Sequence, residues 1–426
     1  MKFDSICVIG LGYIGLPTAS MFAKQGLHVT GVDNNSEVIK SLKAGKIHIY
    51  EPGLQQVVED AIKNGNLSVS EKPVNADAFI IAVPTPFYGD KKADLSYVRA
   101  AAESIVPVLK HGNLVILEST SPPLTTKNHV LPMLEKSGLK AGKDFLLAYS
   151  PERVLPGQIL KELVENARVI GGIDAASAEA GRDLYQVIVK GEIVLTDATT
   201  SEMVKLMENT YRDVNIAIAN EFSRLADRFG VDVWEAIQIA NKHPRVKILN
   251  PGPGVGGHCI SVDPWFFVEA APDITPLINT ARNVNDHQPD FVLSLVKHAL
   301  GDLSGKKLAV LGLAFKPDVD DLRESPAVSV AERLSEEKAD VIACEPFKPD
   351  FSGKGYAVTS SLEQTVKDAD AIILLVAHSR FKTLEPEKMK TATSARIIVD
   401  CVNVLDPQSW QAAGFTLLRL GDRKNI

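Results

Sequence analysis

The sequence predicts an α/β fold with two Rossmann-like, doubly wound parallel-sheet domains joined by a long central helix and further helices. Three observations lead to this prediction. Short apolar strand patterns alternate with helical patterns over residues 5–120, an unbroken helical pattern runs over 199–229, and the alternation returns from residue 307. Such alternation is typical of parallel sheets covered by helices. We therefore expect three domains, over residues 1–196, 197–300 and 301–426.

Length, charge and cysteine content narrow the classes of protein to which the chain can belong. Its 426 residues exceed one ordinary hydrophobic core, and 46 basic against 53 acidic residues give a net charge of −7 without a basic run. Nucleic acid and membrane surfaces are therefore not expected partners, and the longest apolar runs, such as residues 371–377, are too short to span a bilayer. A strand begins almost at once and leaves no room for a signal peptide, so we expect a cytoplasmic protein. The four cysteines show no metal-ligand spacing, and no metal site is expected.

The first strand and the helix after it carry a dinucleotide-binding fingerprint. Gly10, Gly12 and Gly15 follow the strand at 6–9 and open a helix, and Asp33 closes the next strand. The glycines permit a tight turn and a close approach of a pyrophosphate to the helix N-terminus. A carboxylate at the place of Asp33 accepts hydrogen bonds from ribose hydroxyls and repels a 2′-phosphate, which favours NAD over NADP.

Two later strands, at 78–83 and 114–117, end at the edge of the sheet where ligands of open α/β sheets bind. Thr85 and Thr120 follow these strands, so their hydroxyls are candidates for hydrogen bonds to the ribose or the nicotinamide. Ordinary capping of the two loops explains these threonines equally well. Further short strands extend the sheet to about residue 196.

The long helix is predicted from Thr199 to Phe229. Thr199 and Glu202 form a capping-box pair at its start, and Gly230 suits the C′ position at its end. About thirty helical residues span about 45 Å, which is long enough to cross between two lobes.

One face of this helix carries Lys205, Asn209 and Arg212, spaced at i, i+4 and i+7 among apolar neighbours. A solvated polar stripe is the simplest interpretation. A lysine and an asparagine one turn apart are also what a site needs to stabilise an oxyanion beside a reactive thiol. The residues alone leave both interpretations open.

Cys259 follows a loop with four glycines in the six positions 252–257. Glycine lacks the Cβ that keeps a backbone away from a ligand, so such a loop can press against a substrate and present the thiol to it. Together with a nicotinamide site, the thiol indicates oxidation of an alcohol to an acid through an aldehyde that is held as a thiohemiacetal. The alternative is that Cys259 is a small buried hydrophobe at a tight turn.

Residues 307–314 repeat the opening strand in degraded form, and a helix around 326–337 and strands at 341–345, 371–376 and 397–400 follow. This second Rossmann-like unit has lost the glycine fingerprint. Two interpretations are open: it binds a nucleotide in a different way, or it serves only as a structural domain.

Three motifs resemble the UDP-glucose/GDP-mannose dehydrogenase family, and most closely its branch that acts on UDP-N-acetyl-D-mannosamine. They are Ser150-Pro151-Glu152-Arg153-Val154-Leu155-Pro156-Gly157, the segment from His243-Pro244-Arg245 through Gly256-Gly257-His258-Cys259 to Asp263-Pro264-Trp265-Phe266, and Ala314-Phe315-Lys316-Pro317 with Asp320-Asp321-Leu322-Arg323-Glu324-Ser325-Pro326. The resemblance covers the whole chain. It implies an NAD-dependent nucleotide-sugar 6-dehydrogenase of polysaccharide biosynthesis, which oxidises C6 of a UDP-sugar by four electrons with two NAD in succession.

The resemblance also implies roles for individual residues. Among the catalytic residues of the family, Cys259 matches the nucleophile, and Lys205 and Asn209 match the pair that stabilises the oxyanion. Asp263 matches a carboxylate that orders the hydrolytic water, and Glu152 matches an acid implicated in thioester hydrolysis. The residues that match NAD ligands are Gly10, Gly12, Tyr13, Ile14, Gly15, Asp33, Thr85 and Thr120. Those that match the sugar-nucleotide site are Arg153, Val154, Lys205, Asn209, Arg212, His243, Arg245, Gly256, Phe315, Lys316 and Arg323, of which Arg323 matches a ligand of the cofactor pyrophosphate equally well.

Arginine and lysine suit a diphosphate, so the resemblance implies that the domain at 301–426 binds UDP. The central region at 197–300 is implied to be a dimerisation domain of a homodimer, in which Arg245 reaches the site of the partner. Lys205 would supply a positive field for the thiol. His258 is not expected to be the base, because side chains adjacent in sequence often point away from each other.

Two departures from the family bear on the substrate. Pro156 stands where the UDP-glucose branch usually has a second glutamate, which favours an N-acetylated sugar. The segment Asp400-Cys401-Val402-Asn403-Val404 has valine where relatives usually have lysine or arginine. Two alternatives to the mannosamine branch remain. One is a UDP-N-acetylglucosamine 6-dehydrogenase, and the other is an NAD-binding regulatory protein without catalytic activity.

Overall fold

The structure is a computed structural model that describes residues 1–87, 89 and 91–422. The chain forms two compact units, Met1–Glu208 and Asn209–Ile426. Each unit contains its own sheet and its own hydrophobic cores.

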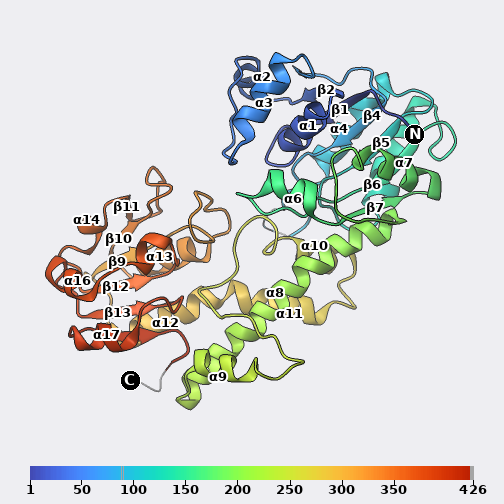
Figure 1. Ribbon diagram of the computed structural model, residues 1–426. Coiled ribbons are helices and arrows are strands. Elements are labelled where there is room, and N and C mark those ends of the chain that lie inside the picture. The colour runs from blue at the N-terminus through green and yellow to red at the C-terminus, as the bar shows by residue number, and fades with distance from the viewer. Residues whose placement is uncertain (88, 90, 423–426) are drawn as a thin grey trace. The chain divides into compact units, whose positions relative to one another are not determined.

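The first unit is built on one eight-stranded sheet (Figure 1). Its strands, in sheet order, are β3 (Leu67–Ser70), β2 (His28–Val32), β1 (Ser5–Ile9), β4 (Ala78–Ile81), β5 (Leu114–Leu117), β6 (Leu146–Tyr149), β7 (Arg168–Gly172) and β8 (Ile193–Asp197). Neighbouring strands are parallel except β6 and β7, which pair antiparallel with Ala148 opposite Gly172. The sheet is therefore parallel, as predicted, over six strands, and β7 and β8 run the other way. A short apolar run does not encode its direction, so the sequence pattern could not show this reversal.

Helices cover both faces of this sheet. Apolar side chains pack on one face from α1 (Gly15–Lys24), α2 (Ser36–Lys43), α3 (Leu54–Lys63), α6 (Ile159–Glu165) and α7 (Ala175–Tyr185), and on the other face from α4 (Ser96–Ile105) and α5 (Leu131–Leu134). Shorter helical segments lie at Val106–Val108, Thr126–Val130 and Glu135–Ser137. Burial on both faces explains why the strands read as continuous apolar runs.

The long helix α8 (Ala198–Phe229) has 32 residues and ends, as predicted, before a left-handed Gly230 with φ +68°. The predicted capping box at its start is wrong. The strand β8 runs directly into the helix, and the Asp197 carboxylate accepts the N–H of Thr200 at 3.1 Å in its place. Glu202 instead accepts the backbone N–H groups of Leu124 and Thr126, at 2.6 and 2.7 Å, and so fixes a loop of the first sheet.

The second unit contains the larger part of α8 and a six-stranded sheet with its covering helices. Between α8 and this sheet, the chain forms α9 (Val233–Ala240), α10 (Asp263–Ala270), α11 (Pro276–Asp286) and α12 (Gln288–Leu300). The strands, in sheet order, are β11 (Ala357–Thr359), β10 (Asp340–Cys344), β9 (Lys307–Leu311), β12 (Ala371–Leu374), β13 (Ile397–Asp400) and β14 (Thr416–Arg419), and all of them are parallel.

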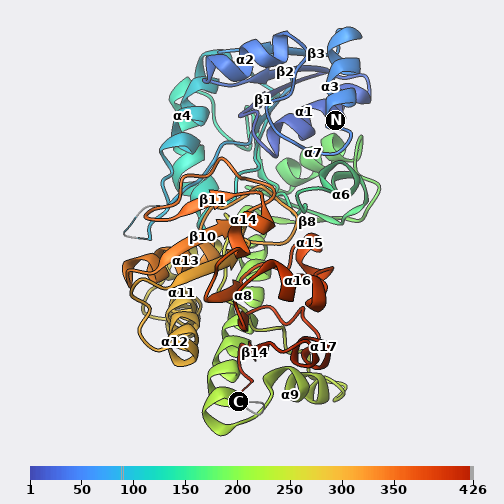
Figure 2. The same ribbon diagram turned by 90° about the vertical axis from the view of Figure 1, so that its left-hand side faces the viewer.

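Figure 2 shows helices on both sides of this second sheet. Apolar side chains of α12 and α13 (Pro326–Glu336) pack on one face, and those of α14 (Leu362–Val366), α15 (Ser379–Lys382), α16 (Pro386–Ala392) and α17 (Pro407–Ala412) pack on the other. The strand order repeats that of the first six strands of the first sheet, so the predicted second Rossmann-like fold is confirmed. Among the described residues, no helix is both long and apolar enough to cross a membrane.

Candidate active site

The turn between β1 and α1 has the geometry that a dinucleotide pyrophosphate needs. Gly10 has φ +93°, and a Cβ on it would lie 2.5 Å from the carbonyl oxygen of Ala82. A Cβ on Gly15 would collide with the carbonyl of Gly10, so both glycines are required by the turn itself. A Cβ on Gly12, in contrast, would meet no described protein atom within 4 Å, which leaves room for a ligand at the N-terminus of α1. Tyr13 and Ile14 complete this turn, and the Tyr13 side chain is exposed.

Asp33 follows β2 at the same edge of the sheet. Its carboxylate accepts the backbone N–H of Leu11 at 3.0 Å and that of Asn35 at 2.9 Å. The two hydrogen bonds fix the carboxylate beside the glycine turn, and each oxygen keeps further lone pairs for a ribose. The residues of the turn and Asp33 therefore fit the adenosine side of NAD.

Thr85 and Thr120 lie together at the carboxyl ends of β4 and β5. The Thr85 hydroxyl donates to the carbonyl oxygen of Thr120 at 2.6 Å. This bond joins the two loops, so the structural interpretation of Thr85 holds. The hydroxyl oxygen of Thr85 can still accept a hydrogen bond from a ligand.

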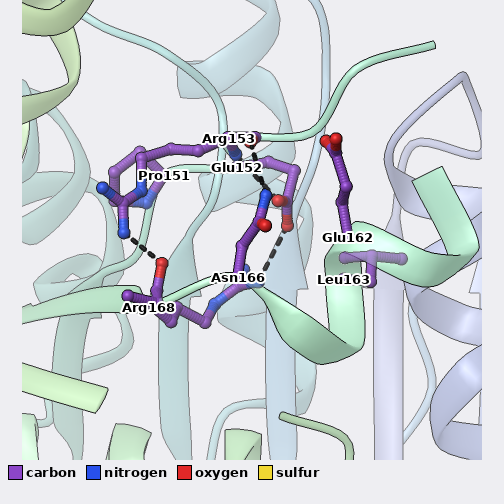
Figure 3. Close-up of a pocket in the computed structure, with 8 residues that line it drawn as sticks. Pro151, Glu152, Arg153, Glu162, Leu163, Asn166 and Arg168 are labelled. Atoms are coloured by element: carbon purple, nitrogen blue, oxygen red, sulfur yellow. Dashed lines mark hydrogen bonds and ion pairs between the residues drawn. The ribbon is translucent and has the colours of Figure 1, made fainter. Parts of the chain in front are cut away.

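Glu152 and Arg153 lie after β6, in a small pocket also lined by Glu162, Asn166 and Arg168 (Figure 3). The guanidinium of Arg168 donates to Glu152 at 2.8 Å, and Glu152 also accepts the backbone N–H of Arg153 at 2.7 Å.

The guanidinium of Arg153, predicted to bind substrate, is engaged within its own unit. It donates to Glu208 of α8 at 2.6 Å and to the carbonyl oxygen of Ala167. The side chain of Val154 is partly buried and packs against the core of the first sheet.

The structure gives a different reason for the glycines of the cysteine loop. A Cβ on Gly256 would lie 2.6 Å from the carbonyl oxygen of Glu324, and one on Gly257, which has φ +87°, would lie 2.8 Å from the ring of Phe315. The Gly257 N–H also donates to the carbonyl oxygen of Arg323 at 3.0 Å. Gly256 and Gly257 thus let the loop pack against the segment that follows β9. The close approach of a substrate to this loop stays a prediction.

Cys259 is partly buried, and its backbone carbonyl accepts the N–H of Asp263 at 2.8 Å, where α10 begins. The buried carboxylate of Asp263 accepts a hydrogen bond from the side-chain amide of Asn209 at 2.6 Å. The three predicted residues Cys259, Asn209 and Asp263 are therefore linked. Lys205 is buried on α8, one turn before Asn209.

The expectation that His258 is not the base stays a prediction, but the surroundings of its ring favour the charged form. The neighbouring Asp321 carboxylate and the side chain of Cys259 raise the pKa of His258 to about 9. Arg323 lies beside the ring nitrogen that is also nearest to Asp321, with its Nη2 at 3.0 Å from Nδ1 of His258, and it forms a two-pronged ion pair with Asp321. The sequence signal that was available is the pair of charged residues, Asp321 and Arg323, in the third motif.

The second Rossmann-like sheet keeps an acidic residue where the first has Asp33. Glu345 follows β10, is fully buried, and accepts the N–H of Leu313 at 2.8 Å. The Nε2 atom of His378 lies 3.2 Å from the same oxygen, while Nδ1 accepts the N–H of Asp318 at 2.9 Å. The Glu345 carboxylate is thus enclosed by protein donors, whereas the Asp33 oxygens each accept one backbone N–H among the described hydrogen bonds.

The remaining predicted substrate residues lie in loops or on exposed surfaces. Arg212 of α8, His243 and Arg245 are exposed, and the Arg245 N–H donates to Nδ1 of His243 at 3.4 Å. Lys316 extends over the ring of Phe315, with Nζ 5.8 Å from the ring centre. Within the described ranges, no group of three or more His, Cys, Asp or Glu side chains is arranged to hold a metal ion.

Comparison with known proteins assigns the three parts of the chain to one family. Residues 4–189 match the NAD-binding domain of the UDP-glucose/GDP-mannose dehydrogenase family, residues 199–287 match its central domain, and residues 309–407 match its UDP-binding domain. The NAD-binding match contains the glycine turn and Asp33, in agreement with their geometry.

Similar proteins cover nearly the whole chain. A UDP-N-acetyl-D-mannosamine dehydrogenase of Methanocaldococcus jannaschii is 50% identical over 426 residues, which cover 99% of this chain and 97% of that protein. The structure of a UDP-D-ManNAc dehydrogenase from Pyrococcus horikoshii has a TM-score of 0.91 and 43% identity, and it covers 99% of this chain and 100% of that one. A UDP-N-acetyl-mannosamine dehydrogenase from Staphylococcus aureus gives a TM-score of 0.91 at 45% identity, with 99% of both chains covered. The chain belongs to the UDP-glucose/GDP-mannose dehydrogenase family and is an NAD-dependent nucleotide-sugar dehydrogenase.

Proposed function

We propose that the enzyme oxidises UDP-N-acetyl-D-mannosamine at C6 to UDP-N-acetyl-D-mannosaminuronate, with two NAD consumed for each acid formed. The names of relatives that are 43–50% identical over almost the whole chain support this substrate. Pro156 supports it too, because it replaces the second glutamate of the UDP-glucose branch. The observation that carries the four-electron chemistry is the link between the Cys259 loop, Asn209 and Asp263.

The NAD site is proposed at the carboxyl edge of the first sheet. The glycine turn at residues 10–15 would hold the pyrophosphate, Asp33 would bind the adenosine ribose, and Thr85 and Thr120 would lie near the nicotinamide end. Bound NAD supplies the acceptor for the hydride that leaves C6 in each oxidation.

Cys259 is proposed as the nucleophile. After the first oxidation, its sulfur adds to the aldehyde carbon to give a thiohemiacetal, and loss of a second hydride from that carbon gives a thioester. Asn209, and Lys205 one turn before it, are proposed to stabilise the oxygen that becomes negative in these steps. Asp263 holds the Asn209 amide at 2.6 Å, so the amide would be oriented before substrate binds.

Hydrolysis of the thioester completes the reaction. Water attacks the carbonyl carbon, the bond between this carbon and the Cys259 sulfur breaks to free the thiolate, and the acid is released. Glu152 is proposed to accept a proton from this water, and Asp263 to help to order it. The Glu152 carboxylate is held by Arg168 and by the N–H of Arg153, which limits its movement.

The sugar nucleotide is proposed to bind through the residues that match the sugar-nucleotide site of the family. Candidate ligands are Arg153, Val154, Lys205, Asn209, Arg212, His243, Arg245, Gly256, Phe315, Lys316 and Arg323. Arginine and lysine side chains among them would balance the negative charge of the diphosphate. Because the chain as a whole has a net charge of −7, this positive charge has to come from side chains at the site. The active unit is proposed to be a homodimer in the cytoplasm, with polysaccharide precursors as the products.

The test is a panel of UDP-sugars, with NADH absorbance and product mass as the two measurements. Two NADH per uronic acid, no free aldehyde, and the highest kcat/KM on UDP-N-acetyl-D-mannosamine are expected. A higher kcat/KM on the glucosamine epimer would replace the proposed substrate, and absence of NADH with every sugar would favour a regulatory protein. The Cys259→Ala variant should lose acid formation but keep nucleotide-sugar binding, because the thiol acts in the chemistry. Substantial acid formation by this variant would disprove the role of Cys259.

A further inference from the structure

Behind Glu152, in the first unit, lies a buried cluster with a second carboxylate. Glu118 directly follows β5 and its side chain has no solvent-exposed surface, while that of Arg168 is 4% exposed. The Arg168 guanidinium donates to Glu118 through Nη2, to Glu152 through Nη1 at 2.8 Å, and to the Ser150 hydroxyl through Nε at 2.9 Å. One guanidinium therefore bridges two carboxylates, and only Glu152 borders the pocket in Figure 3.

The reversal of β7 makes this bridge possible. Arg168 is the first residue of β7, and because β7 is antiparallel to β6, its start lies at the edge where β5 and β6 end. In a parallel strand, the first residue would lie at the opposite edge, far from Glu118 and Glu152. The strand direction thus brings the guanidinium to the edge of the sheet at which ligands bind.

The elements around Glu118 hold its carboxylate in place. The hydroxyl of Tyr185 on α7 donates to it at 2.9 Å, and the hydroxyl of Thr18 on α1 lies 3.4 Å away. The ring of Tyr185 also lies under the guanidinium of Arg168, 3.7 Å from its central carbon. Arg168, Tyr185 and Glu152 are thus the charged or titratable groups that face Glu118.

The charge of the cluster is unbalanced. Two carboxylates share one guanidinium, so the fully ionised cluster has a net charge of −1. Burial raises the pKa of Glu118 to about 7, even though the charge of Arg168 opposes this shift, and the negative charge of Glu152 raises it further. An ion pair of Arg168 with Glu152 alone would be neutral and less costly to bury, so the second carboxylate calls for a functional reason.

We propose that Glu118 is a positioning residue which acts through Arg168 to keep Glu152 a competent base for hydrolysis of the thioester. By sharing the guanidinium, Glu118 withdraws part of its positive charge from Glu152, so that Glu152 binds the proton of the attacking water more readily. In this step the water oxygen bonds to the carbonyl carbon, its proton passes to Glu152, and the C–S bond breaks to release the sulfur of Cys259. The inference rests on the proposed function, in which Glu152 serves this step.

A change at Glu118 should affect only one of the two halves of the reaction. The two hydride transfers do not use Glu152, so a change at Glu118 should leave them intact and slow only the release of acid. An enzyme with this defect accumulates the thioester, and it then shows a rapid burst of NADH followed by slow turnover.

The experiment replaces Glu118 by Gln in the full-length enzyme. Glutamine has the same shape and can still accept hydrogen bonds from Arg168 and Tyr185, but it lacks the charge. We expect a burst of two NADH per active site as in the unchanged enzyme, a steady-state rate about tenfold lower, and an acid limb of the pH profile that moves to lower pH by about one unit. Glu152→Gln should show the same burst with a still lower steady rate.

Glu162→Gln is the matched control. Glu162 lines the same pocket and holds the N–H of Leu155 at 2.6 Å, and it is not a partner of Arg168 among the described hydrogen bonds. The same loss of one negative charge should therefore leave the steady rate and the pH profile unchanged. An equal effect of Glu118→Gln and Glu162→Gln, or none from either, would overturn the inference.

A second variant, Glu118→Asp, keeps the charge but draws it back by one methylene group. It should give the full burst and a steady rate between those of the unchanged enzyme and Glu118→Gln, and it provides the test if the glutamine variant does not fold. An unchanged steady rate and acid limb in Glu118→Asp would then refute the role of Glu118. Failure of the proposed function has a different signature, because the unchanged enzyme itself would then not form two NADH per acid.

Discussion

The Nδ1 atom of His258 lies 3.6 Å from a carboxylate oxygen of Asp321, and this pair stands next to the proposed nucleophile. Burial alone would raise the pKa of Asp321, but its hydrogen bonds to Arg323 and His258 lower it, so the carboxylate stays charged. The charged carboxylate in turn favours the protonated ring. A protonated imidazole beside a thiol stabilises the thiolate, so His258 is a candidate for activation of Cys259.

From this pair we predict how the contribution of His258 to the stability of the protein changes with pH. Because the pKa of His258 is raised from 6.5 to about 9, its contribution to stability is fully present below pH 6.5 and is lost as the pH rises through 9. The variant His258→Gln should therefore destabilise the protein more at pH 6 than at pH 9.5. The ring is 41% exposed and solvent screens the pair, so we expect a difference of ~1 kcal/mol or less. Denaturant unfolding at the two pH values measures it, and an equal destabilisation at both would contradict the raised pKa.

The packing of the cysteine loop predicts that Gly257→Ala is destabilising. The φ of +87° is strained for alanine, and the new methyl group would lie 2.8 Å from the Phe315 ring. We expect a loss of ~1–3 kcal/mol in the free energy of unfolding, together with weaker binding of the sugar nucleotide. Gly252→Ala, whose Cβ would meet no described protein atom within 4 Å, is the control and should change stability by ~0.5 kcal/mol or less.

Asp33 is predicted to set the choice of cofactor. The unchanged enzyme should strongly prefer NAD, and Asp33→Asn should reduce the ratio of kcat/KM for NAD to that for NADP by about tenfold, which corresponds to ~1.4 kcal/mol. The carboxylate also holds the N–H groups of Leu11 and Asn35, so Asp33→Ala should additionally lower kcat/KM with both cofactors. The ratio separates the two effects, because a loosened turn affects both cofactors alike. Equal use of NAD and NADP by the unchanged enzyme would exclude this role.

The parts of the structure that could be read from the sequence were those fixed by local chemistry. The glycine turn is one, since the collision at Gly15 follows from the turn itself. The long helix is another, because its pattern is uninterrupted up to Gly230. The alternation of short apolar strand patterns with helical patterns also predicted the two sheets, whose strand orders follow general rules of chain connection.

The features that could not be predicted from the sequence depend on the direction of strands and on contacts between residues that are far apart in the chain. The contact of Glu118 with Arg168 joins residues 50 positions apart, and it requires a reversed strand that no apolar pattern encodes. The available signal was that Glu118 follows one buried strand and Arg168 begins another, since a buried charge needs a partner. The position of His258 depends on which way its side chain turns, and adjacency to Cys259 does not determine that.

The exposed face of α8 leads to the prediction on assembly. Its large apolar side chains, exposed at helical spacing within the second unit, are Tyr211, Ile218, Phe222, Leu225 and Phe229. A stripe of this kind along one helix suits a contact with a second copy of the chain. We expect a homodimer in solution, in which Arg245 of one subunit binds the substrate diphosphate in the site of the other.

Two inactive variants, Arg245→Ala and Cys259→Ala, test this arrangement when they are mixed under conditions that allow subunits to exchange. If Arg245 acts across the dimer, a mixed dimer has one site with both defects and one site with an intact Cys259 and an intact Arg245. Random exchange makes about half of the dimers mixed, so activity should return to roughly a quarter of the unchanged level. If Arg245 acts within its own subunit, every site in every dimer carries one defect. Size measurements that confirm exchange while activity stays absent would therefore rule out the shared site.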